Sequence, residues 1–146
     1  MIHLKPVSYD CIHDFEDTTY SKMSSDEKRQ MIEDSICKEH NGKYFELLAV
    51  CDDDRIVGFM NLCAHSAHIV SIGPEIKISF QRSGFGFRGE TQALQYAKHE
   101  GYTIAIAIVR EDNSASIALH EKLGFEVGAH TISKSGNPVR IYLKNL

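Results

Sequence analysis

The sequence has no tryptophan and only three prolines, and none of its apolar runs approaches the roughly 20 residues that a membrane helix needs. It lacks the cationic segment and apolar run of a signal peptide, and it has no CxxC or HExxH motif that would predict a metal site. A basic excess is missing too, because 16 Lys and Arg stand against 20 Asp and Glu, which argues against a dedicated nucleic-acid binder. We therefore expect a cytoplasmic protein with no metal, nucleic-acid or membrane partner.

What is present is typical of one globular domain. A chain of 146 residues buries roughly 70 % of the surface that it exposes when unfolded, so residues 1–146 can form a single domain without disulfide bonds. Hydrophobic residues make up 42 % and charged residues 25 %, which excludes a disordered chain. The four cysteines are far apart, and we expect them to be reduced and structural. The pair His65 and His68 is interpreted as turn residues.

Apolar spacing predicts the elements of the first half of the chain. Ser24 and Glu27 form a capping box that starts the clearest helix. The predicted elements are a strand over Ile2–Val7, helices over Asp10–Tyr20 and Ser24–His40, and a hairpin of Tyr44–Cys51 with Ile56–Ala64.

In the second half, strands and helices alternate. Gly73-Pro74 is expected to separate two strands, and the almost continuous β-branched run Tyr102–Val109 is typical of a strand that is covered on both faces. The predicted elements are strands His68–Gly73 and Glu75–Phe80, helix Phe87–His99, strand Tyr102–Val109, helix Asn113–Leu123, and a closing hairpin of Phe125–Ile132 with Val139–Leu143. This order predicts an α+β fold, a mixed sheet with helices on both faces.

The glycine loop Gln81–Gly89 joins a predicted strand to a predicted helix. Unpaired N–H groups at a helix start suit a phosphate, and glycine lets the phosphate approach them. The spacing Gly84-x-Gly86-x-x-Gly89, followed by Glu111-Asp112, also matches a dinucleotide fingerprint, but too little chain follows for that fold. No Gly-Lys-Ser/Thr is present, so a Walker loop is excluded. A tight turn without a ligand is the plain alternative.

Two motifs taken together resemble a known family. Gln81-x-x-Gly84-x-Gly86 is similar to the acyl-CoA pyrophosphate motif of the GNAT N-acetyltransferases, and about thirty residues later Asn113 to Phe125 resembles their second signature. The resemblance covers roughly residues 44–143. It implies a mostly antiparallel central sheet with a splayed parallel strand pair and acetyl-CoA as cosubstrate.

The resemblance also assigns residues to the cofactor site. Backbone amides of the loop would hold the pyrophosphate, the splayed strand would pair with the pantetheine arm, and Asn113 would contact the cofactor or act only as a helix N-cap. The cofactor-binding residues that it implies are Ile76, Ile78, Gln81, Arg82, Ser83, Gly84, Phe85, Gly86, Phe87, Asn113 and Ser116.

The implied reaction is direct attack of a neutral amine on the thioester. The Ile76 N–H would polarise the carbonyl. His120 stands where the family most often has a Tyr acid, and its alternative is a partly buried helix histidine. Glu75 is the nearest carboxylate for a base, and a water chain is its alternative. Ile108 stands where members that acetylate protein N-termini tend to carry Glu, so a small-molecule amine is favoured over a protein.

The acceptor is not identified by these motifs. Carboxylates on the early helices either attract a cationic amine or form ordinary solvated faces. We therefore predict an N-acetyltransferase that moves acetyl from acetyl-CoA to a primary amine. The alternative is a non-catalytic acyl-CoA-binding sensor or docking module. A homodimer is the family-level expectation.

Overall fold

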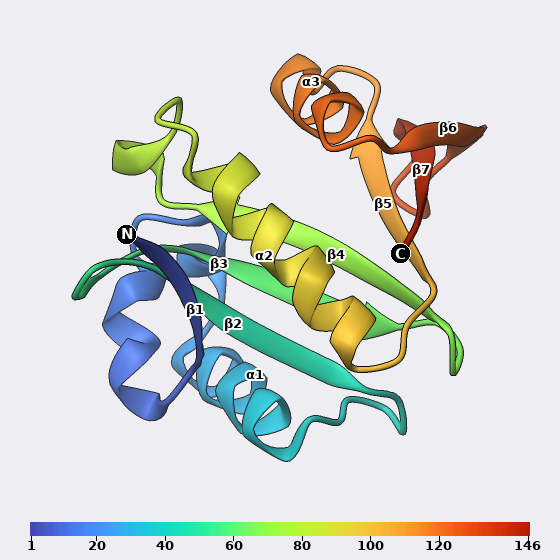
Figure 1. Cartoon of the computed structure of the whole chain (residues 1–146). Helices are drawn as coiled ribbons and strands as arrows, with labels where there is room; N and C mark the ends of the chain where they lie inside the picture. Colours follow the sequence, from blue (N-terminus) through green and yellow to red (C-terminus); the bar gives the residue numbers. More distant parts are fainter.

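Seven strands form one sheet in the order β1-β2-β3-β4-β5-β7-β6. The computed structural model describes all 146 residues (Figure 1). All neighbouring strands are antiparallel except β4 and β5, which are parallel, so the predicted mixed, mostly antiparallel α+β sheet is confirmed. The strands are β1 Ile2–Pro6, β2 Phe45–Asp52, β3 Arg55–Ala64, β4 Ile69–Ile76, β5 Ile104–Arg110, β6 Glu126–Ile132 and β7 Pro138–Asn145.

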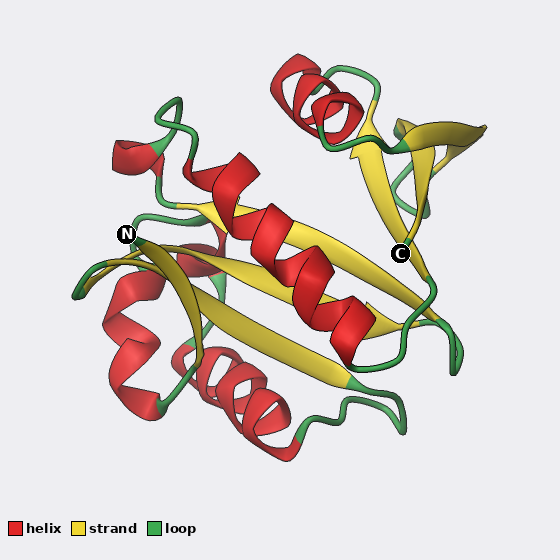
Figure 2. Ribbon diagram, viewed as in Figure 1, coloured by secondary structure: helices red, strands yellow, loops and turns green.

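Helices cover both faces of this sheet, as expected (Figure 2). Helix α1, Ser25–Cys37, packs with the first 3-10 turn over one face, and the predicted Ser24–Glu27 capping box is formed. Helices α2, Phe85–His99, and α3, Ser114–Lys122, contribute to the larger core on the other face. None of the helices is long and apolar enough to cross a bilayer.

The helix expected over Asp10–Tyr20 is wrong. Two 3-10 turns, η1 Tyr9–Phe15 and η2 Thr19–Lys22, take its place. Thr18 ends the first turn and starts the second, because its hydroxyl donates to the Phe15 carbonyl and accepts from the Tyr20 N–H. A side chain that bonds its own backbone in this way competes with α-helix formation.

The strand pair expected on either side of Gly73-Pro74 is also wrong. Strand β4 runs through both residues, and the chain then makes a 3-10 turn, η3 Ile78–Phe80, instead of continuing as a strand. The Lys77 N–H bonds the Val57 carbonyl of β3, so strand alternation turns the backbone of Pro74 and Ile76 to the other edge. Proline is tolerated where that edge needs no ladder hydrogen bond.

The other edge of β4 is open because the parallel pair separates. Only Ile69–Ser71 pairs with Ile104–Ile106, and beyond these residues the two strands diverge (Figure 1). The resemblance predicted this splay. The expectation that β5 is covered on both faces is wrong, however, since Ala105 and Ala107 are buried while Ile108 on the opposite face is 57 % exposed. Helix α1 packs on β2 and does not cover β5.

Candidate functional site

The strongest feature of the site is a run of free backbone donors. None of the N–H groups from Arg82 to Phe87 donates a hydrogen bond within the chain. They lie where β4 and η3 lead into the first turn of α2, and residues 81–84 are exposed. Six successive donors at the positive end of a helix form a site for an anion such as a pyrophosphate.

The three glycines of the loop have different physical roles. Gly84 has φ of +80° and is the α2 N-cap, so it takes the left-handed conformation that glycine adopts most readily. At Gly86 an added Cβ would lie 3.7 Å from Ile76 Cγ1 and from Leu119 Cδ2, which is ordinary contact. At Gly89 it would lie 2.8 Å from a Met60 methyl, so this glycine allows close helix–sheet packing.

The splayed edge of β4 lies next to this loop. The backbone of Ile76 faces the opening, and its carbonyl accepts a hydrogen bond from the Gln81 side chain at 3.2 Å. The backbone of Ile78 is engaged elsewhere, because its N–H donates to the Asp17 carbonyl and its own carbonyl accepts from the Gln81 N–H. Ile78 lies in η3, so the extended conformation expected for it is wrong, and any role in cofactor binding stays a prediction.

Helix α3 approaches the loop from the β5 side. Asn113 is its N-cap, and the side-chain oxygen accepts from the Ser116 N–H at 3.1 Å, so the N-cap interpretation holds. Leu119 lies beside Gly86, and the Lys122 ammonium lies 4.3 Å from the centroid of the Phe87 ring. The second half of α3 therefore lies against the first turn of α2.

His120 is in the interior of the protein. Its side chain is stacked on Tyr142, and the residue is only 1 % exposed. Its Nδ1 lies 2.8 Å from the Ser116 carbonyl, and its Nε2 lies 3.0 Å from Oε1 of Glu90, which is fully buried. To protonate a thiolate in the opening, the ring would have to leave both partners. The acid role of His120 stays a prediction.

The pKa values of this pair both lie above the ordinary range. Burial raises the pKa of Glu90, although the neighbouring His120 opposes this. Burial lowers the pKa of His120, but the hydrogen bond and charge of Glu90, with the Ser116 carbonyl, outweigh burial and raise it. Glu90 Oε2 has no hydrogen-bond partner at all. Sequence reasoning missed Glu90, yet a signal was present: a carboxylate stands at the core-facing position between Phe87 and Leu94 of an apolar helical stripe.

Glu75 faces the other side of the sheet. It pairs across β3 with Phe59, which belongs to the core on the α1 face, and its Oε1 accepts from the Thr19 N–H at 2.7 Å. Ser71 and Ile106 are parallel partners on this same face. Glu75 thus lies on the face of the sheet opposite α2, and its base role stays a prediction.

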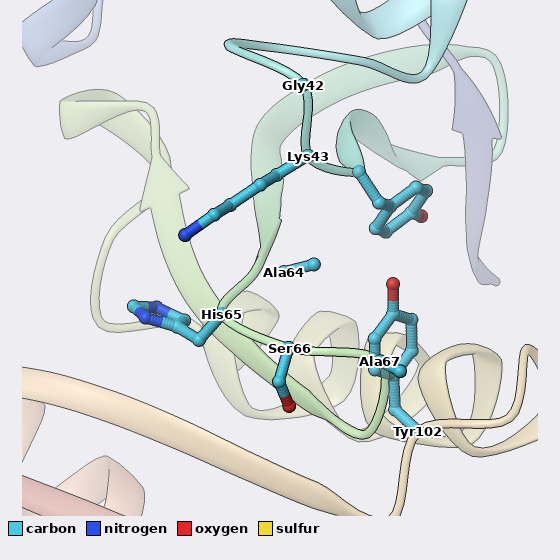
Figure 3. Close-up of a pocket in the computed structure, with 8 residues that line it drawn as sticks. Gly42, Lys43, Ala64, His65, Ser66, Ala67 and Tyr102 are labelled. Carbon is cyan, nitrogen blue, oxygen red and sulfur yellow. The ribbon is translucent and has the colours of Figure 1, made fainter.

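Two hollows of the surface lie away from the loop. A cavity of about 270 Å³ is formed near the β3–β4 turn, at the opposite end of β4, with Lys43, His65 and Tyr102 around it (Figure 3). A second one lies against the β6–β7 hairpin, beside Gly124 and Leu143. His65 and His68 lie in the turn between β3 and β4, as interpreted from the sequence.

Comparison with known proteins gives a family and a fold. The sequence profile described as "Acetyltransferase (GNAT) family" matches residues 9–125. Comparison with curated proteins finds no significant match.

Solved structures with the same fold include three N-acetyltransferases. A spermidine N-acetyltransferase SpeG chimera from Vibrio cholerae superposes with a TM-score of 0.82 at 17 % identity, over 98 % of this chain and 95 % of that one. An acetyltransferase from Salmonella typhimurium that modifies the N-terminal serine of a ribosomal protein superposes with a TM-score of 0.81 at 17 % identity, over 99 % of this chain and 95 % of that one. PaiA N-acetyltransferase from Thermoplasma acidophilum, in complex with coenzyme A, superposes with a TM-score of 0.75 at 17 % identity, over 100 % of this chain and 99 % of that one.

Proposed function

Because this chain belongs to the acetyltransferase (GNAT) family, we propose that it transfers the acetyl group of acetyl-CoA directly to a primary amine. The observation that carries the proposal is the run of six free N–H groups beside the open edge of β4. The diphosphate of acetyl-CoA fits these donors, and its amide-rich arm fits a strand edge that lacks a partner. Acetyl-CoA is a cosubstrate, and the similar PaiA enzyme was solved with coenzyme A.

The residues around the opening have distinct tasks in this reaction. The amides of Arg82 to Phe87 bind the diphosphate, and Asn113 and Ser116 start the helix on the far side. The Ile76 N–H is placed to donate to the carbonyl oxygen as charge develops on it. The amine enters from the Glu75 face, and its nitrogen bonds the carbonyl carbon. The carbon–sulfur bond then breaks, coenzyme A leaves as its thiolate, and the amine proton passes to Glu75.

The first prediction concerns Glu75 as the base. In Glu75→Gln the amide oxygen still accepts from the Thr19 N–H, so the local contact is kept while the basic group is lost. We expect kcat to fall about 100-fold, the lower range for loss of a general base, with KM for acetyl-CoA unchanged. Steady-state kinetics from pH 6 to 9 measure both. An unchanged kcat across this range would assign proton removal to a water chain.

The early carboxylates are predicted to be structural. Glu33 contacts Tyr9, Asp34 contacts His40, and Asp14 pairs with Lys77 at 2.6 Å. The contacts of Glu33 and Asp34 are exposed, and exposed pairs contribute little to stability and are screened by salt. We expect Glu33→Gln with Asp34→Asn to change KM for a cationic amine less than twofold at low salt. A steep rise in KM there would place the acceptor beside α1.

A panel of amines tests the proposal as a whole. Release of the coenzyme A thiol is followed with acetyl-CoA and, in turn, a polyamine, an amino sugar, an amino acid and a peptide. Amine-dependent release supports transfer, and a small-molecule amine is the proposed acceptor class. Slow release that no amine accelerates would favour the alternative, a non-catalytic acyl-CoA-binding module. The homodimer stays a prediction, and sedimentation measures it.

A further inference from the structure

The molecule has two parts that meet at the diverging strands. One part holds β1 to β4 with α1 and α2, and the other holds β5, α3, β6 and β7 (Figure 1). Their backbones bond only around Ile69–Ser71 and Ile104–Ile106 and at the adjoining His68 carbonyl, which is one end of the pair. Beyond that end, side chains join the two parts, because Phe125 of the second part and Leu94 of α2 belong to the same apolar core.

One polar contact joins these helices. Glu90 of α2 and His120 of α3 form the only hydrogen bond between two side chains that links the two parts, and it is also their only ion pair. It lies in the interior, because Glu90 is fully buried and His120 is 1 % exposed. The other contacts there are Leu119 beside Gly86 and the Lys122 ammonium over the Phe87 ring.

The two ring nitrogens of His120 have different hydrogen-bond partners, and this fixes the orientation of the ring. Since a carbonyl oxygen only accepts, the Nδ1 of His120 must carry a proton to bond Ser116 at 2.8 Å. That bond fixes the ring on its own helix and aims Nε2 at Glu90 Oε1, with one further proton shared between these two atoms. Phe125 and Tyr142 pack against the ring and leave it little freedom to turn.

We propose that the buried Glu90–His120 hydrogen bond is a clasp that sets the distance between the cofactor loop and α3, and thereby the width of the opening that receives acetyl-CoA. Glu90 and His120 are then positioning residues. The inference rests on the proposed cofactor site for its consequence, but the clasp itself is a property of the free protein. Because Glu90 Oε2 has no hydrogen-bond partner, the contact of Oε1 with His120 is the only polar contact of this buried carboxyl group.

Few other charged groups face the clasp. On β7, Tyr142 stacks on His120, and its hydroxyl contacts Arg140 and donates to Glu121. No other ionisable side chain forms a hydrogen bond with either member of the pair.

A matched set of variants tests the clasp. Glu90→Gln keeps a hydrogen-bonding amide of the same shape, whereas Glu90→Met removes the bond at similar volume. The double variant Glu90→Met with His120→Phe fills the site with apolar groups and is expected to fold even where a single variant does not. Calorimetry with acetyl-CoA gives Kd for each, and amide hydrogen exchange in the free protein gives the protection of α3 relative to α1.

The clasp predicts different results for the variants that lose the bond and for the one that keeps it. In Glu90→Met and in the double variant, Kd for acetyl-CoA rises about tenfold, as loss of one hydrogen bond to a charged group typically allows, and the amides of α3 exchange faster. Glu90→Gln stays within about twofold of the parent in both. An unchanged Kd with unchanged α3 protection in the double variant would overturn the clasp. A lower kcat of the double variant at saturating acetyl-CoA, with unchanged Kd, would also overturn the clasp and would make His120 the acid. Failure of the parent protein to bind acetyl-CoA refutes the proposed function, while hydrogen exchange still decides on the clasp.

Discussion

Replacing Gly86 with valine is expected to weaken acetyl-CoA binding about 100-fold or more while the protein stays folded. A Cβ at this position meets only Ile76 Cγ1 and Leu119 Cδ2, each at 3.7 Å, so the protein itself tolerates the first added carbon. The larger side chain would extend between β4 and α3, into the opening beside the free amides, and would hold the ligand away from them. Calorimetry with acetyl-CoA measures the loss, and circular dichroism measures the fold.

Two glycine variants serve as controls for this result. Gly86→Ala adds only the tolerated carbon and should bind acetyl-CoA nearly as the parent does. Gly89→Ala should destabilise the fold and leave acetyl-CoA binding unchanged, because its Cβ would lie 2.8 Å from Met60 Cε and 3.2 Å from both Val50 methyls. Such overpacking costs about 1–3 kcal/mol, partly offset by the better helix propensity of alanine, so Tm falls with little change in Kd. If Gly86→Val bound acetyl-CoA normally, the anion site would have to lie elsewhere.

Replacing His120 with phenylalanine is expected to destabilise the protein by about 3–5 kcal/mol, as removal of one partner of a buried charged pair does. The substitution leaves the fully buried Glu90 carboxyl without its only partner. For a chain of this length the fall in Tm would be about 6–20 °C, which a thermal melt resolves easily. Adding Glu90→Met should restore most of the loss, and a double variant as unstable as His120→Phe would contradict this account of the pair.

The same pair makes stability depend on pH, and the sign follows from the raised pKa values. The pKa of His120 is raised chiefly by Glu90 against the effect of burial, so the folded protein keeps a proton that the unfolded chain releases above about pH 6.5. The contribution to stability is full below that pH and is lost as pH rises toward the folded-state pKa, with a slope up to about 1.4 kcal/mol per pH unit. Urea unfolding from pH 6.5 to 8.5 should show this slope in the parent and a flatter one in the double variant.

The order of elements was largely predictable, because periodicity and capping are local signals. The capping box at Ser24 lies where the sequence indicated, and the helix after the glycine loop begins at Phe85, two residues before the predicted start at Phe87. The errors come from tertiary context. Pro74 does not break β4, because its missing N–H faces an edge that needs no partner, and Thr18 divides a helical pattern through two short side-chain bonds.

The candidate site also has a part that was predictable from the sequence and a part that was not. The anion-binding amides follow from local glycine and helix signals, so the loop was predictable. The environment of His120 was not, because its partner Glu90 lies thirty residues away on another helix. Position within a motif suggested an acid, with a partly buried helix histidine as the alternative, and packing against Phe125 and Tyr142 puts the ring in the core.

The central claim is that the amides of Arg82 to Phe87 form an acetyl-CoA site, and a thermal-shift titration tests it most directly. A ligand at a hundredfold excess over Kd stabilises the native state by about 2.7 kcal/mol, which raises Tm by about 5–10 °C at this chain length. The account predicts a saturable rise of this size with acetyl-CoA, lost in Gly86→Val, and none with NADH. A rise with NADH alone would contradict it and would make the Gly84-x-Gly86-x-x-Gly89 spacing a dinucleotide site.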